Sequence, residues 1–218
     1  LKQEDVKLIR DKINDNQLSI NEIIKKPVKV KPKPPFITST LQQSASTRLG
    51  FNVKRTMRVA QKLYEAGYIT YMRTDAPSLS KDSINDARNF INENLGENYL
   101  TNAPRIYSST ENAQEAHEAV RPTNTFLRSS DLINLSEEEV KLYKLIWERF
   151  VASQMPDAEY LSTSAKTFVD EHIFVAKGRE LVFDGFTKVL KTSSKEEDIL
   201  PSLNEAVSYT HLTQPTKA

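Results

Sequence analysis

The 218-residue sequence contains no cysteine, only three histidines and no long apolar run. Without cysteine, the chain can form neither disulfide bridges nor thiolate metal sites. His117, His172 and His211 lie far apart and lack metal-ligand spacing, so no metal site is predicted in this chain. No stretch reaches about 18 consecutive apolar residues, which argues against a membrane-spanning helix. The charged N-terminal residues are unlike a secretory signal, and a cytoplasmic location is the default expectation.

Charge is unevenly distributed along the chain, although the formal net charge is only +1. Residues 31–80 carry eight lysines and arginines against two acidic residues, a local balance of +6 that leaves −5 for the remainder. A basic block on an otherwise acidic chain is typical of proteins that bind a polyanion such as DNA or RNA. A solvated helix face would produce the same pattern, so charge alone leaves both interpretations open.

The apolar pattern predicts an α+β fold with a helical middle between β-rich flanks. Helices are expected at about residues 3–15, 40–49, 53–66, 80–96, 113–120 and 136–156, and strands at 18–24, 68–74, 167–169, 172–176 and 180–186. Ser39 or Thr40 is the expected cap of the second helix. Four prolines and four lysines in residues 26–35 predict an extended connector, and Lys177-Gly178 predicts a turn. The lack of an initiator methionine suggests that the chain begins within a longer protein.

The helix expected at 53–66 has a strongly basic face. Lys54, Arg58 and Lys62 recur every four residues, and Arg55 adjoins them. An apolar face built on residues 57, 60 and 64 is expected opposite them. Such a helix could follow a nucleic-acid backbone while packing on a protein core.

A tyrosine and an arginine follow this helix in the sequence GYITYMRTD, residues 67–75. Side chains alternate along an extended chain, so Tyr71 and Arg73 are expected to project to the same side. A phenol has a pKa near 10 and needs help to act as a nucleophile. A guanidinium could stabilise its anion or hold the phosphate under attack. The alternative is a packing tyrosine, which is common in extended segments.

A second polar motif, QEAHEAVRP, spans residues 114–122. If this stretch is helical, His117 and Arg121 share a face four residues apart, beside Gln114. That face would offer two phosphate donors and an amide. A polar helix end without any function fits these residues equally well.

Three stretches together strongly resemble the central region of bacterial DNA topoisomerase I, the type IA family. They read PPFITSTLQQSASTRLGF, RTMRVAQKLYEAGYITYMRTDAPSLS and NAQEAHEAVRP, and the resemblance runs from about residue 27 to 203. It implies that Tyr71 is the nucleophile that forms a 5′-phosphotyrosine link. It further implies that Arg73 is the catalytic arginine and that His117 is an active-site histidine, as a phosphate contact or proton relay.

The resemblance also implies which residues contact DNA and how the chain divides. With the basic helix included, the expected DNA-binding residues are Lys54, Arg55, Arg58, Gln61, Lys62, Glu65, Thr70 and Arg121. Residues 1–30 would end a preceding helical region and begin a β-rich arch domain. Residues 31–157 would form the helical domain with the catalytic tyrosine, and 158–218 the return pass of the arch. The final ten residues or so depart from the family pattern, and no function is assigned to them.

The family places its Mg²⁺-binding acidic cluster in a Toprim domain nearer the N-terminus, and no such cluster is present in this sequence. The fragment alone is therefore predicted not to relax DNA. The expected partner is single-stranded DNA within negatively supercoiled duplex, with no membrane contact. The parent is expected to be monomeric and cytoplasmic, in association with the nucleoid. The alternatives are a non-catalytic single-stranded DNA-binding module and a tyrosine recombinase. The β-rich flanks and the Tyr-x-Arg order argue against the recombinase.

Overall fold

The structure is a computed structural model that describes residues 18–107, 118–169, 172–191 and 208–209. Contacts divide the chain into two compact units. The strand unit comprises residues 1–29, 159–183 and 193–218, and the helical unit comprises 30–158 and 184–192. The second unit therefore takes in residues 184–192, which the sequence analysis had assigned to the β-rich region. The expected α+β class is confirmed.

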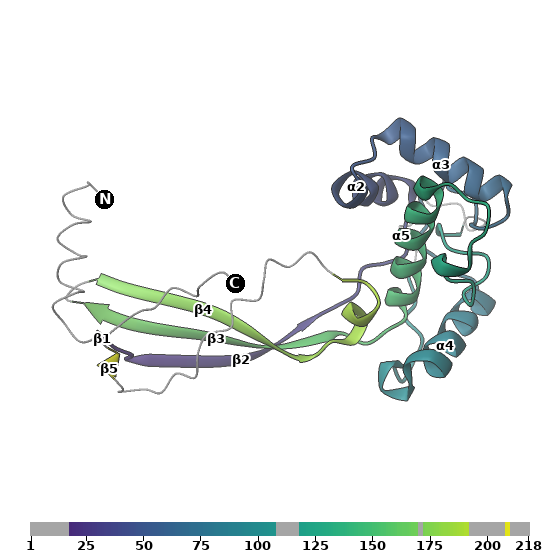
Figure 1. Cartoon of the computed structure of the whole chain (residues 1–218). Coiled ribbons are helices and arrows are strands. Elements are labelled where there is room, and N and C mark those ends of the chain that lie inside the picture. Colours follow the sequence, from purple (N-terminus) through teal and green to yellow (C-terminus); the bar gives the residue numbers. More distant parts are fainter. Residues whose placement is uncertain (1–17, 108–117, 170–171, 192–207, 210–218) are drawn as a thin grey trace. The chain divides into compact units, whose positions relative to one another are not determined.

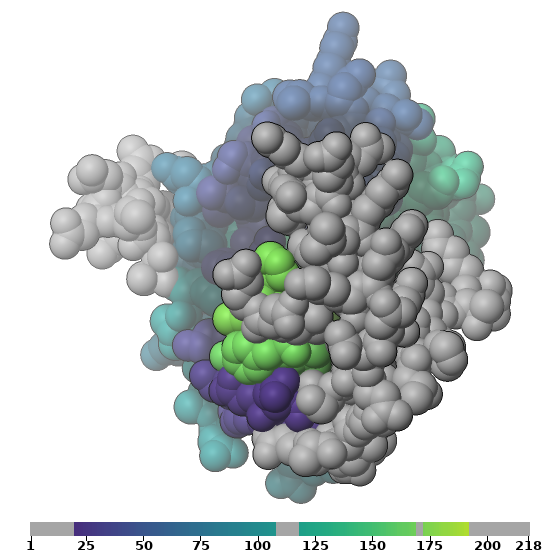
Figure 2. Space-filling model, turned by 90° about the vertical axis from the view of Figure 1, so that its left-hand side faces the viewer, coloured from purple at the N-terminus to yellow at the C-terminus, as the bar shows by residue number. Residues whose placement is uncertain are grey.

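Three long strands form the sheet of the strand unit in the order β2–β3–β4. They are β2 (Glu22–Val30), β3 (Ala158–Val169) and β4 (His172–Phe183). They lie side by side in Figure 1, and in Figure 2 the purple atoms of β2 adjoin the green atoms of the β3–β4 pair. Two short strands, β1 (Leu18–Ser19) and β5 (Ser208–Tyr209), pair separately.

The strands are longer than the sequence pattern predicted. The expected turn at Lys177-Gly178 is wrong, because Gly178 pairs with Thr163 in the middle of the antiparallel β3–β4 ladder. Most side chains of β4 are exposed, so the alternation of apolar and polar residues that marks a half-buried strand is weak there. Pairing across the hairpin, rather than local pattern, sets the length of these strands.

The proline-rich segment forms more strand than expected. Residues 26–30 continue β2, and only 31–35 are an irregular connector. Pro27 can lie inside β2 because this strand is at the sheet edge, where only one side of the strand pairs with a neighbour. Ion pairs from Lys29 to Glu159 and from Lys166 to Glu22, at 2.6 and 2.8 Å, join β2 to β3.

The helical unit contains four described α-helices whose limits follow local signals. They are α2 (Thr38–Leu49), α3 (Val53–Glu65), α4 (Lys81–Leu95) and α5 (Glu137–Ser153), with short 3-10 turns η1 (Glu97–Tyr99), η2 (Ser129–Asp131) and η3 (Gly185–Lys188). Side chains of Asn52, Ser80 and Ser136 accept the capping hydrogen bonds of α3, α4 and α5. Gly50 ends α2 with a φ of 68°, which glycine adopts without strain.

Helix α2 begins two residues before the expected range. Its N-cap position is Ile37, whose N–H donates to the Thr40 hydroxyl, so neither Ser39 nor Thr40 is the cap. The buried face of α3 also differs from the expected one. It consists of Thr56, Val59, Ala60 and Leu63, whereas Tyr64 is 40% exposed. The buried face of α3 is therefore displaced by about one residue from the expected one. Packing against the rest of the unit, which cannot be read from the local sequence pattern, decides which side of the helix is buried.

One core holds α2, α3 and α5 together with the loops that cross them. Its buried members are Phe36, Leu41, Ala45, Phe51, Val59, Ala60, Leu63, Ile69, Met72, Val120, Leu142, Tyr143, Leu145 and Ile146. Two of these, Ile69 and Met72, belong to the segment that carries Tyr71. Burial of apolar side chains is the main source of stability, so the tyrosine segment is attached to the most stable part of the unit.

Of two loop segments, one has the expected local structure and the other does not. Residues 68–74, predicted as a short strand or extended segment, are extended and form a single bridge between Ile69 and Pro122. Residues 118–120 are not helical, because Val120 pairs with Phe36 in a second bridge. The expected helix at 3–15 and the first part, 113–117, of the helix expected at 113–120 fall outside the described residues. None of the described helices is long and apolar enough to cross a membrane.

Candidate active site

The segment that follows α3 presents a regular alternation of exposed and buried side chains. Tyr71, Arg73 and Asp75 are exposed, whereas Met72 and Thr74 between them are buried. Tyr71 is 47% exposed. As expected from the sequence, Tyr71 and Arg73 therefore lie on one side of an extended chain. The buried residues fix the segment and leave the reactive groups open to a ligand.

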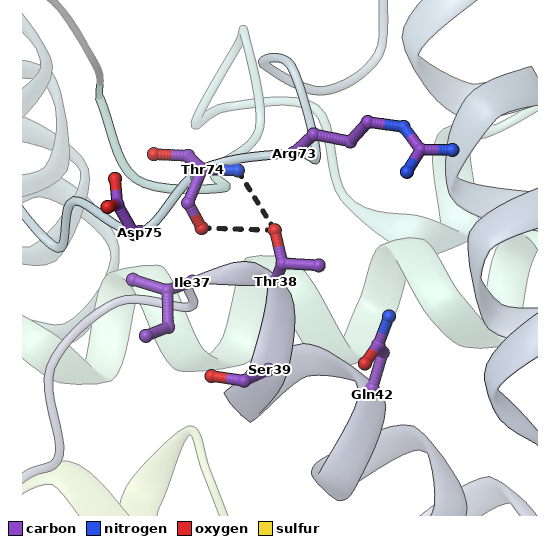
Figure 3. A pocket seen from close by; sticks show the side chains of 7 residues that line it. All are labelled: Ile37, Thr38, Ser39, Gln42, Arg73, Thr74 and Asp75. Atoms are coloured by element: carbon purple, nitrogen blue, oxygen red, sulfur yellow. Dashed lines mark hydrogen bonds between the residues drawn. The ribbon is translucent and has the colours of Figure 1, made fainter.

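Hydrogen bonds with Thr38, in the first turn of α2, hold this segment in place. The Thr38 hydroxyl donates to the Met72 carbonyl at 2.8 Å and accepts from the Thr74 N–H at 2.9 Å. The Thr38 N–H donates to the Thr74 carbonyl, also at 2.9 Å. Figure 3 shows Thr38 beneath Thr74, between Arg73 and Asp75. One threonine thus fixes the backbone on both sides of Arg73.

The 119–122 segment holds the residue just before Tyr71. The Thr70 N–H donates to the Arg121 carbonyl at 2.9 Å, and the Arg121 N–H donates to the Thr70 hydroxyl at 3.0 Å. The Thr70 hydroxyl in turn donates to the Ala119 carbonyl at 2.7 Å. Tyr71 therefore lies between two anchored residues, which restricts the conformations open to its backbone.

The ring of Tyr71 packs edge-on against Tyr64 at the end of α3, with ring centroids 5.2 Å apart and planes at 63°. Both rings remain at least 40% exposed. Within the described ranges, the Tyr71 hydroxyl has no hydrogen-bond partner. The contact fixes the direction of the phenol while its oxygen stays available.

An open pocket of about 410 Å³ adjoins Arg73. Its lining comes from the first turns of α2 and from the tyrosine segment: Ile37, Thr38, Ser39, Gln42, Arg73, Thr74 and Asp75. Figure 3 shows the Arg73 and Gln42 side chains extending on the same side of Thr38. An exposed guanidinium beside a helix N-terminus is suited to bind an anion such as a phosphate group.

The basic face of α3 meets the acidic first turn of α5. Arg55 contacts one carboxylate oxygen of Glu138 at 2.6 Å, and Arg58 contacts the other at 3.3 Å. Lys62 lies 3.6 Å from Glu139. Hydrogen bonding from Arg55 and attraction by both arginines hold the pKa of Glu138 below its ordinary value. Lys54 is exposed and has no ion pair among the described residues. Three of the four expected DNA-binding cations on α3 are therefore paired within the protein.

Three further expected DNA-binding residues, Gln61, Glu65 and Arg121, are also engaged internally. Gln61 donates to Glu65 across one turn of α3 at 2.8 Å. The Arg121 guanidinium forms two hydrogen bonds of 2.9 Å with Glu118, and its side chain is only 17% exposed. The Arg121–Glu118 ion pair thus stabilises the loop that contacts Thr70. His117 and Gln114, the other members of that motif, lie outside the described residues.

A sequence profile of the DNA topoisomerase family matches residues 1–217. This chain belongs to the family of bacterial type IA DNA topoisomerases. It is 52% identical over 197 residues to DNA topoisomerase 1 of Pasteurella multocida, covering 88% of this chain and 23% of that protein. Against DNA topoisomerase 1 of Escherichia coli K12, identity is 48% over 207 residues, which is 90% of this chain and 24% of that protein.

The fold of the topoisomerase chain also matches a known structure. Full-length topoisomerase I from Thermotoga maritima superposes with a TM-score of 0.80 and 35% identity, over 95% of this chain and 34% of that one. The family resemblance that the sequence motifs indicated is confirmed. The chain spans about a quarter of the length of the curated relatives described above.

The described residues of this topoisomerase chain do not fit a bound Mg²⁺. Within the described ranges, no group of three or more His, Cys, Asp or Glu residues could hold a metal ion. Hard cations such as Mg²⁺ need several oxygen ligands, usually including carboxylates.

Sequence reasoning missed three residues that organise the topoisomerase site. Thr38 bonds the tyrosine segment, Glu118 holds Arg121, and Glu138 neutralises Arg55 and Arg58. Each of the three residues forms hydrogen bonds with a loop or with another helix. Glu138 lies in a run of three glutamates, and acidic residues are favoured at the N-terminus of a helix. The local sequence therefore accounts for this glutamate without any partner on α3. Nothing in the local sequence points to its partners on α3.

Proposed function

We propose that this chain is the strand-cutting and strand-rejoining region of a type IA DNA topoisomerase, with Tyr71 as nucleophile. The observation that carries the proposal is the exposure of Tyr71 and Arg73 on one side of a segment anchored at Thr70 and Thr74. An enzyme of this kind relaxes negatively supercoiled DNA by cutting one strand, passing another through the gap and resealing it. Its substrate would be a single-stranded region of the duplex.

The proposed step is a transesterification. The Tyr71 oxygen loses its proton and forms a bond to the phosphorus of a phosphodiester, while the bond to the 3′ oxygen of the preceding nucleotide breaks. The 3′ oxygen leaves with a proton, and the other fragment stays linked through a 5′ phosphotyrosine. Arg73 would stabilise the negative charge that develops on the phosphate oxygens. Because a phosphodiester is exchanged for a phosphotyrosine, the reverse attack reseals the strand without ATP.

The remaining expectations concern the parent protein. Mg²⁺ would be held by a Toprim domain outside this sequence, so the fragment alone would not relax DNA. His117 would contact the phosphate or relay a proton. The parent would act as a cytoplasmic monomer on nucleoid DNA.

The test is covalent capture in a chimaera. Residues 27–203 would replace the matching region of the full-length Escherichia coli relative, which is then given Mg²⁺ and a single-stranded oligonucleotide labelled at its 3′ end. Denaturation and digestion should yield a labelled peptide containing Tyr71. Tyr71→Phe should abolish labelling and leave binding within about twofold, because only the nucleophilic oxygen is lost.

Tyr64→Phe is the matched control, since Tyr64 contacts the Tyr71 ring and has a hydroxyl of its own. It should keep its covalent label. A Tyr71→Phe chimaera that still forms covalent complexes would refute the assignment.

A non-catalytic single-stranded DNA-binding module is the second candidate. The exposed Tyr64–Tyr71 pair beside a basic helix favours it, because bases stack on such rings in single-strand channels. In the same assay, this function would give binding without any covalent label while the unmodified relative still cleaves.

A further inference from the structure

The first turn of α5 contains three glutamates with three different sets of partners. Glu137 pairs with Lys141 in its own helix at 2.6 Å. Glu139 completes the capping box by accepting from the Ser136 N–H and hydroxyl, both at 2.7 Å. Glu138 bonds only to α3 within the described residues. Its carboxylate therefore contributes to contact between helices and has no capping role in α5.

Glu138 occupies the position that a phosphate group would need on α3. One of its oxygens accepts from Arg55 Nε at 3.1 Å and Nη2 at 2.6 Å, and the other accepts from Arg58 at 3.3 Å. Two oxygens of one anion thus bridge two arginines a turn apart. A phosphodiester has two non-bridging oxygens with the same charge and can accept the same donors.

The two arginines differ in how freely they can change partner. The Arg55 guanidinium lies over the Phe51 ring, 4.2 Å from its centroid, and its side chain is 40% exposed. The Arg58 side chain is 64% exposed. Glu138 itself is 35% exposed, so an anion from solvent can reach the cluster. Arg55 would stay in position on Phe51 while its acidic partner is exchanged.

We propose that Glu138 is an internal competitor of the DNA backbone for Arg55 and Arg58. This inference rests on the proposed function, because it requires that the basic face of α3 binds DNA. In the free protein the carboxylate neutralises part of that face. A bound strand displaces it, so the affinity for DNA is lower than the four cations of α3 would otherwise give. Glu138 is then an affinity-setting residue whose effect is greatest at low salt, where both interactions are least screened.

The test measures how tightly the chain binds a fluorescently labelled single-stranded oligonucleotide of mixed sequence, by anisotropy at about 50 mM and about 200 mM salt. Glu138→Gln is compared with Glu137→Gln. The two variants remove the same charge from the same helix turn, but only the first frees the arginines. An exposed ion pair changes an equilibrium by a small factor, so Glu138→Gln should bind about threefold to tenfold tighter at low salt. Glu137→Gln should bind within about twofold of the original chain.

At the higher salt the difference between the two variants should shrink towards unity. Glu138→Asp, which keeps the charge but is one methylene too short to bridge both arginines, should fall between the original chain and Glu138→Gln. If circular dichroism shows that Glu138→Gln folds poorly, Glu138→Asp takes its place in the comparison.

Equal gains in Glu138→Gln and Glu137→Gln would overturn the inference, since net charge alone would explain them. Weaker binding by Glu138→Gln would also overturn it, because Glu138 would then orient the arginines for DNA. Either result leaves the proposed function intact if Lys54→Ala still weakens binding. The inference and the proposed function are both overturned only if the original chain fails to bind the oligonucleotide, or if Lys54→Ala leaves its affinity unchanged.

Discussion

Single hydrogen-bonding groups hold the segment that carries Tyr71 in one conformation. Thr38 is the clearest case, because its hydroxyl bonds the backbone of both Met72 and Thr74. Thr74 is buried, so its N–H has no access to water if this bond is lost. A buried donor without an acceptor costs about 1–3 kcal/mol.

Replacing Thr38 by valine removes the hydroxyl and keeps the shape. We expect Thr38→Val to lower the free energy of unfolding by about 1–3 kcal/mol, measured by urea denaturation. In the chimaera it should also lower the rate of covalent capture. Thr47→Val, on the same helix, is the control. Its hydroxyl bonds only exposed carbonyls of its own helix, so its effect should stay within about 0.5 kcal/mol. Equal effects of the two changes would show that Thr38 does not anchor the tyrosine segment.

At the scale of elements, Glu118 joins the start of α4 to the loop that holds Thr70. It accepts from the Ser80 N–H at 2.9 Å, from the Ser83 hydroxyl at 3.1 Å and from Arg121 at 2.9 Å. Burial raises the pKa of Glu118, but the hydrogen bonds from Arg121, Ser80 and Ser83 outweigh it and hold the pKa below its ordinary 4.5. The carboxylate is thus the form that the fold prefers.

This preference makes stability depend on pH in a defined direction. Because the pKa is lower in the folded than in the unfolded chain, Glu118 stabilises the fold above pH 4.5, and this contribution disappears as the pH falls through the folded pKa. We expect Glu118→Gln to lower the free energy of unfolding by about 1 kcal/mol at pH 7 and to have little effect near pH 3. Urea denaturation at both pH values measures this.

Glu93→Gln, at an exposed position of α4, is the control and should have little effect at either pH. A Glu118→Gln effect of equal size at pH 7 and pH 3 would mean that the loss of shape, and not of charge, is responsible.

At the scale of the whole chain, the uneven charge distribution is the feature that bears on DNA. The +6 of residues 31–80 includes the α3 cations, and most of these are paired with α5. Lys54, which is unpaired among the described residues, and Arg58, whose side chain is 64% exposed, are therefore the charges most available to a phosphate backbone. Each phosphate contact releases a counterion, which makes the affinity dependent on salt.

The double change Lys54→Ala with Arg58→Ala should weaken oligonucleotide binding and reduce the salt slope of log K by about 1 to 2. Anisotropy titrations at several salt concentrations measure both quantities. The control is Lys25→Ala with Lys26→Ala, which removes two exposed positive charges from β2. If the two pairs weaken binding equally, net charge rather than the α3 face governs binding.

Local signals in the sequence were sufficient for the α+β class, the limits of α3 and α4, the start of α5, and the common side of Tyr71 and Arg73. A cap, an apolar repeat and the alternation of an extended chain each involve residues only a few positions apart. The family could likewise be recognised from motifs alone. The contact roles of Thr38, Glu118 and Glu138 could not be.

Their partners are 34 to 36 residues away for Thr38, 38 for Glu118 with Ser80, and 83 for Glu138 with Arg55. Only the tertiary packing of the helical unit brings those groups together. The same reason accounts for the strand lengths, since Gly178 continues a strand only because Thr163 lies opposite it. The sequence determined which groups are candidates for DNA binding and catalysis, and the tertiary structure decided which of them are already paired within the protein.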